Sequence, residues 1–312
     1  MVVFGICERH LGRRQMKLNV GLVLALAAYV FWGVVPIFWR QIDHVEPMQI
    51  VAHRMLWSFV LVTALIFILG QGRQLLSTFK DRVTLWRLFL ASCFVSINWA
   101  VFIWAVNSGY LIETAMGYFI NPLISVVFGI FIFKERLRRW QMLAIAIATI
   151  GVLVMVVAQG KVPWIALSLA VTFTLYSVMK KRVSLPATHG MSIETMFFVL
   201  PALAYLMWRQ QLGVGSFGNG TATTDVLLVL GGLLTLIPLT LFAAAAKRVT
   251  LITLGMCQYI GPTLQFLIAV FLYQEALGGV RLFAFCCIWL ALIVYSADLL
   301  RMNRSAEKLI NA

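Results

Sequence analysis

Long apolar stretches alternate with short polar ones along the whole chain. Ten of the apolar stretches run for about 18 to 25 residues with few or no charges, and each could cross roughly 30 Å of hydrocarbon as a helix. The second is weakened by His53 and Arg54, and the seventh by Glu194. The pattern predicts an all-α membrane protein with ten transmembrane helices, at residues 18–39, 47–69, 88–106, 114–133, 140–160, 162–179, 191–208, 226–246, 249–273 and 280–299.

The composition supports this interpretation. Of the 312 residues, 62% are hydrophobic and only 12% are charged, whereas soluble domains are about 25% charged. Such a chain is not a secreted or cytoplasmic enzyme. The odd count of five cysteines does not suggest a disulfide framework.

The net charge of +14 is explained by the placement of the basic residues. Twenty of the 25 lysines and arginines fall in the termini and in the segments after spans 2, 4, 6 and 8, four fall on the other side, and Arg54 lies inside a span. Cytoplasmic segments of membrane proteins carry such an excess. We therefore expect both termini to be cytoplasmic and expect no binding of nucleic acid.

The chain contains an internal repeat. Residues 105–137 align without a gap on residues 245–277, at an offset of 140, with nine identities in 33 positions. Each repeat holds five spans, so the second copy enters the membrane from the opposite side and the two five-helix halves are inverted. Two inverted bundles can rock about a site at the membrane midplane and open it alternately to either side.

The repeat sets the predicted domain boundaries. The first repeat occupies residues 16–160 and the second residues 161–300, followed by a cytoplasmic tail at 301–312. Residues 1–15 do not fit the membrane pattern. We expect them to be a disordered or untranslated leader, with Met16 as the working start.

Five segments carry a family resemblance: FWGVVPIFWR (31–40), HRMLWS (53–58), NWAVFIWAVN (98–107), GYFINP (117–122) and KERL (134–137). They resemble the RarD, or chloramphenicol-sensitive, family of EamA-type permeases in the drug/metabolite transporter superfamily. The resemblance extends from Met16 to about Asp298. It implies a multi-pass permease of the bacterial inner membrane with ten helices in two EamA-like repeats, and it does not fix a substrate.

Polar stripes in the two repeats indicate a binding cavity. Tyr118, Asn121 and Ser125 lie on one helix face, and the repeat-related positions include Gln258 and Gln265. Polar groups that face lipid are costly, so both stripes should face the bundle interior or a watery cavity. The alternative is that these side chains only form hydrogen bonds between helices.

Prolines inside spans are predicted helix kinks, at Pro36, Pro122, Pro238 and Pro262. Each removes a backbone hydrogen bond, and the carbonyls freed near the midplane could coordinate a substrate or a cation. The alternative is that the prolines only fit their helices to neighbours.

Aromatic and small polar residues at helical spacing complete the predicted site, because aromatic faces suit flat or cationic organic molecules. Trp39 and Trp208 are assigned instead to the interfacial belt. The predicted substrate-binding residues are Trp32, Arg54, Asn98, Trp99, Tyr118, Asn121, Ser125, Thr172, Tyr176, Gln258 and Gln265.

Charged residues leave the coupling mechanism open. Arg54 could reach the interface, pair with Glu113, or hold an anionic substrate, and the family resemblance favours a structural role. The acidic residues, including Glu194, are placed near span ends, so no proton carrier is expected at mid-membrane. Glu135 and Glu275 are expected to organise the turns after spans 4 and 9.

No motif indicates an enzyme. Gly213, Gly215 and Gly218 spell GxGxxG, but they lie between helices with no strand before them. No nucleotide-binding, hydrolase or metal motif is present, so we expect no cofactor and no metal. The predicted function is secondary transport of a small organic metabolite or drug across the lipid bilayer. The alternative is a flippase for lipid-linked substrates or a membrane protein that does not transport, and the oligomeric state is left open.

Overall fold

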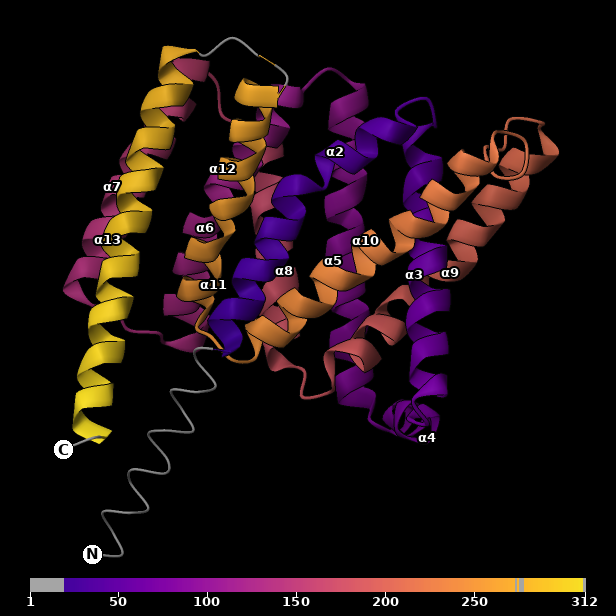
Figure 1. Ribbon diagram of the computed structural model, residues 1–312, viewed down its shortest axis with the longest axis horizontal. Coiled ribbons are helices and arrows are strands. Elements are labelled where there is room, and N and C mark those ends of the chain that lie inside the picture. The colour runs from indigo at the N-terminus through magenta and orange to yellow at the C-terminus, as the bar shows by residue number, and fades with distance from the viewer. Residues whose placement is uncertain (1–19, 273, 275–277, 311–312) are drawn as a thin grey trace, which may run out of the picture.

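The computed structural model describes residues 20–272, 274 and 278–310, which are helical with short connections and contain no strand (Figure 1). The predicted leader and Glu275 lie outside these residues. The first helix runs over Val20–Ile42 and includes α2 (Pro36–Trp39) and a final 3-10 turn. The other helices are α3 (Pro47–Ile68), α4 (Gly72–Ser77), α5 (Arg82–Asn107), α6 (Leu111–Phe133), α7 (Arg139–Gln159), α8 (Trp164–Arg182), α9 (Ala187–Gln211), α10 (Ala222–Ala246), α11 (Leu251–Gln258), α12 (Ile260–Leu267) with η3 (Ile268–Leu272), and α13 (Gly279–Ile310).

The all-helical membrane class is confirmed for nine spans. In the described part of the chain, nine helices are long and apolar enough to cross a membrane, and they match nine of the ten predicted segments. The predicted sixth segment forms α8, which packs against α5 and α6 and is not among the nine. Thr174, Tyr176 and Lys180 of α8 are buried, so this helix turns polar residues toward other helices.

The helices form an elongated bundle. The first helix starts at the same end as α13 finishes, and we call this the termini end (Figure 1). The other end, which holds α2 and the start of α3, is called the far end. Helix α13 packs on α7 at one edge of the bundle, and α3 packs between α9 and α10 at the other.

The four prolines differ in their effect on the backbone. The first helix is interrupted at Val35, directly before Pro36, and the ninth span is divided into α11 and α12 at Tyr259, three residues before Pro262. The helix is continuous through Pro122 and Pro238.

Positions 140 residues apart share local features. Lys134 and Gln274 are the two non-glycine residues with positive φ in the described chain, at 52° and 53°, a conformation that L-residues seldom adopt. The hydroxyl of Tyr259 also donates a hydrogen bond to the carbonyl of Phe119, 140 residues earlier, at 3.2 Å. Spans 4 and 9 therefore cross near repeat-related positions.

Candidate functional site

A cavity of about 510 Å³ lies among the first helix, α3, α5, α6, α8, α10, α11 and α12. The lining includes Pro36 at the start of α2 and Pro47 at the start of α3, so the cavity extends to the elements of the far end. The lining includes eight of the eleven predicted substrate-binding residues: Trp32, Arg54, Asn98, Trp99, Tyr118, Asn121, Gln258 and Gln265. Its size is within the range of pockets that hold small organic molecules.

Arg54 is the charged group in the lining of this cavity. Its guanidinium carbon lies 4.8 Å from the ring centroid of Trp39 and 5.0 Å from that of Trp99. Its Nε donates a hydrogen bond of 2.8 Å to Thr235. Among the residues that the structure describes, no carboxylate forms an ion pair with Arg54. Glu113, the partner considered in the sequence analysis, pairs instead with Lys161 at 2.6 Å.

Amide and hydroxyl groups on one wall are connected between helices. Asn98 donates to the carbonyl of Leu169 at 2.8 Å and to the hydroxyl of Thr172 at 2.9 Å. Thr174 donates to the amide oxygen of Asn121 at 2.9 Å. These bonds hold α5 and α6 against α8 and fix the orientation of both amides, and Asn98 and Asn121 also line the cavity.

Three of the predicted residues lie behind the cavity wall. Ser125 is buried and shares a hydrogen bond of 3.2 Å with Thr174. Thr172 is an acceptor for Asn98, and Tyr176 lies deeper in α8 and is fully buried.

Sequence reasoning missed several lining residues, notably Trp39 and Thr235. Trp39, which the sequence analysis assigned to the interfacial belt, lines the cavity beside Arg54. It follows the interruption of the first helix at Val35, directly before the predicted kink at Pro36.

Five aromatic rings pack together beside the cavity, three of them in its lining, and we call them the aromatic plug: Tyr29, Trp32, Phe173, Tyr176 and Phe242. Phe242 is fully buried, and its ring centroid lies 5.5 to 6.2 Å from those of the other four. Its ring is nearly parallel to that of Tyr176, with an interplanar angle of 13°. The plug belongs to the first helix, α8 and α10, so relative movement of these helices would open it.

Beyond the plug, charged groups join the helices at the termini end. The carboxylate of Glu135 accepts hydrogen bonds from the backbone N–H groups of Leu251 and Ile252, at 2.7 and 2.9 Å, and lies 3.7 Å from Lys181. An anion is favoured at a helix N-terminus, so Glu135 stabilises the start of α11. Glu135, which was expected to organise the turn after span 4, thus also contacts the start of the ninth span.

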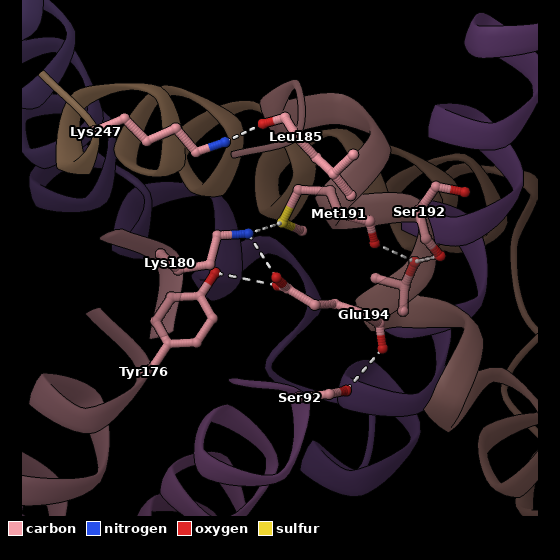
Figure 2. A network of polar contacts seen from close by, with 9 residues as sticks. Ser92, Tyr176, Lys180, Leu185, Met191, Ser192, Glu194 and Lys247 are labelled. Atoms are coloured by element: carbon pink, nitrogen blue, oxygen red, sulfur yellow. Dashed lines mark hydrogen bonds and ion pairs between the residues drawn. The ribbon is translucent and has the colours of Figure 1, made fainter. Parts of the chain in front are cut away.

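A buried ion pair lies in the same region. Lys180 of α8 and Glu194 of α9 are 2% and 4% exposed, and their charged groups are 2.6 Å apart (Figure 2). The placement of Glu194 near a span end needs correction. Helix α9 begins at Ala187, four residues before the predicted start, so Glu194 lies roughly 10 Å into the helix at 1.5 Å per residue.

Comparisons with known proteins agree with this architecture. Residues 19–157 match the EamA-like transporter family. The chain is 40% identical to the uncharacterized transporter YojE of Bacillus subtilis, over 92% of this chain and 97% of the relative. It is 38% identical to the protein RarD of Escherichia coli, with the same coverage of both chains. A crystal structure of a protein 20% identical in sequence shares the fold with a TM-score of 0.67, over 88% of this chain and 96% of the other.

Proposed function

The chain belongs to the RarD-type EamA permeases and is a membrane transporter of the drug/metabolite class, and on that premise we propose that it carries a small organic anion through the cavity around Arg54. The substrate combines a carboxylate or a similar anionic group with an apolar or aromatic body. It moves by alternating access, between a state open at the far end and a state open at the termini end.

The observation that carries this proposal is the environment of Arg54. A guanidinium in the lining of a membrane cavity, with no carboxylate partner among the described residues, attracts an anion. Its planar donors suit a carboxylate. The indole rings of Trp39 and Trp99 hold the guanidinium from their ring faces and leave room in the cavity for the organic body.

The arrangement of the two ends supports alternating access. The cavity reaches toward the far end, whereas the aromatic plug and the Glu135 contacts close the termini end. With both termini in the cytoplasm of a bacterial inner membrane, as the distribution of basic residues favours, this conformation faces outward. In this proposal the chain has ten spans, with α8 as the sixth, in two inverted repeats. When the two halves exchange conformations, the cavity closes at the far end and opens at the termini end.

The test is the thermal stability of the purified protein in detergent with a panel of compounds. The panel holds amino acids, nucleosides, sugars, chloramphenicol and lipid-linked sugars. It also holds aromatic acids, each matched with its neutral amide, such as benzoate with benzamide and phenylacetate with phenylacetamide. A compound present at 100 times its dissociation constant stabilises the protein by about 2.7 kcal/mol.

We expect an acid to stabilise the protein and its amide not to. Arg54→Gln should weaken binding of that acid by about ten- to a hundredfold, because a charge-assisted hydrogen bond contributes about 1.5–3 kcal/mol. Arg281→Gln is the matched control, since Arg281 is exposed and outside the cavity. Equal stabilisation of the wild-type protein by an acid and by its amide would contradict an anionic substrate. Equal stabilisation of the wild type and of Arg54→Gln by the acid would contradict it as well. Stabilisation by lipid-linked sugars alone would favour a flippase.

A further inference from the structure

The Lys180–Glu194 pair is unusual because two ionisable groups are buried inside the bundle without being part of the substrate cavity. Lys180 Nζ lies 2.6 Å from Glu194 Oε1, and the hydroxyl of Tyr176 donates to Oε2 at 3.4 Å. Ser92 of α5 donates to the backbone carbonyl of Glu194 at 2.7 Å. Figure 2 shows Tyr176 and Lys180 of α8 pointing to the carboxylate of Glu194, while Ser92 of α5 reaches the backbone carbonyl of the same residue.

Burial of such a pair is costly for a purely structural contact. The attraction of two buried charges often fails to repay their desolvation, and apolar replacements can be equally stable. Ionisable residues inside membrane helices therefore mark ion or proton pathways by default.

A small void separates this pair from the substrate cavity. Its volume is about 30 Å³, large enough for a water molecule. It is lined by Glu194 and Tyr176 and by the hydroxyl-bearing residues Ser58, Ser92, Ser96, Thr195 and Thr235. The hydroxyl of Ser96 is buried and has no hydrogen-bond partner among the described residues, so it is available to a water in the void.

Thr235 joins the two spaces. It lines both the void and the substrate cavity, and its hydroxyl accepts the hydrogen bond from Arg54 Nε. Trp99 and Leu239 also line both. The Glu194 side chain therefore lies next to the substrate cavity, and Thr235, Trp99 and Leu239 form the boundary between the void and the cavity.

We propose that Glu194 is the proton-binding group of this transporter, with Lys180 as its counterion, and that one proton is carried in each cycle. This inference rests on the proposed transport function and names its coupling ion. The proton leaves a water molecule and binds a carboxylate oxygen of Glu194, which becomes a neutral acid. When the termini end opens, the proton returns to water and the carboxylate pairs with Lys180 again.

Protonation of Glu194 would also favour a movement of helix α8. Once Glu194 is neutral, the ammonium of Lys180 is a buried charge without its partner, which is strongly unfavourable. Movement of α8 relative to α9 exposes that charge to water, and α8 also carries Tyr176 of the aromatic plug. Proton binding therefore favours opening of the termini end.

The charged and titratable groups that face Glu194 come from two other elements. Helix α8 contributes Tyr176 and Lys180, and the end of α10 contributes Lys247, whose ammonium donates to the carbonyl of Leu185. Lys247 lies beyond its span, and burial, together with repulsion from Lys180, lowers its pKa to about 8. Titration of Lys247 must therefore be separated from that of Glu194 in any test.

The test is infrared difference spectroscopy of the protein in lipid as the pH is lowered from about 8 to 5, a range that includes the pKa values of buried carboxyl groups. The carbonyl stretch of a protonated carboxyl group reports Glu194 and is silent for Lys247. We expect this band in the wild-type protein and its loss in Glu194→Gln. Glu46→Gln is the matched control, because Glu46 also pairs with a cation at 2.6 Å, yet its side chain is 40% exposed.

A second variant keeps the test decisive if Glu194→Gln does not fold. Lys180→Met removes the counterion and should move the band to higher pH, by at least a tenfold change in proton concentration. A wild-type protein with no carboxyl band in this range, or a band that persists in Glu194→Gln, would overturn the proposal. The titration needs no substrate, so its outcome is independent of the compound panel that tests the transport function.

Discussion

Phe242 is the centre of the aromatic plug, and its removal is the sharpest test of the packing that closes the termini end. The ring is fully buried and contacts four other rings. Such aromatic pairs contribute about 0.5–1.5 kcal/mol each beyond burial, which sums to about 2–6 kcal/mol. Phe→Ala substitutions in protein cores cost about 3–5 kcal/mol. We therefore expect Phe242→Ala to lower the free energy of unfolding by about 3–5 kcal/mol.

The assay is reversible unfolding in mixed micelles with increasing sodium dodecyl sulfate, followed by tryptophan fluorescence. Phe283→Ala is the control, since Phe283 lies in a span and is 48% exposed, and its loss should be below about 1 kcal/mol. If the two alanine variants lose the same stability, the ring cluster does not hold the helices together and the reasoning is wrong.

Two further predictions concern helix contacts outside the plug. Gly255→Ala should lower the free energy of unfolding by about 1–3 kcal/mol in the same assay, because the added Cβ would lie 3.0 Å from the carbonyl oxygen of Pro122. Gly279→Ala is the control and should be neutral, because no atom lies within 4 Å of its added Cβ. The hydroxyl and backbone N–H of Thr84, which bind Asp81 at the start of α5, lower the pKa of that carboxyl from its ordinary 3.8. The ionised Asp81 therefore contributes fully to the stability of the folded protein above pH 3.8. That contribution is lost as the pH falls through the lower pKa that Asp81 has in the folded protein. The difference in melting temperature between wild type and Asp81→Asn should narrow under acid, and a difference independent of pH would contradict this.

Hydrophobic periodicity predicted most of the fold, because lipid-facing helices must be apolar along most of their length. The sixth predicted segment also forms a helix, α8, but this helix is surrounded by other helices, carries Thr174, Tyr176 and Lys180 toward them, and is not among the nine candidate spans. Hydropathy measures the cost of contact with lipid, so it is a weaker guide to whether a helix with little of that contact crosses the membrane.

The candidate site was predicted in outline and missed in the details that need three dimensions. The polar stripes of spans 4 and 9 come together at a cavity, which Tyr118 and Gln258 line. The place of Trp39 beside Arg54 was missed, and the Lys180–Glu194 ion pair was missed because its two residues lie in different helices. Charge pairs between helices leave no periodic signal in a single sequence.

The contacts at the termini end determine how much binding free energy a substrate would have to supply to open that end in the proposed cycle. In the proposed cycle, opening that end would break the Glu135 hydrogen bonds to α11 and separate Lys180 from Glu194. Hydrogen bonds to charged groups contribute about 1.5–3 kcal/mol each, so two of them hold the closed state by about 3–6 kcal/mol. Inverting a population from 1:99 to 99:1 takes about 5.5 kcal/mol of differential binding. An anion at Arg54 would have to overcome this cost and also that of separating Lys180 from Glu194. A proton on Glu194 removes the second of these contacts, so in the proposed cycle the anion and the proton favour opening together.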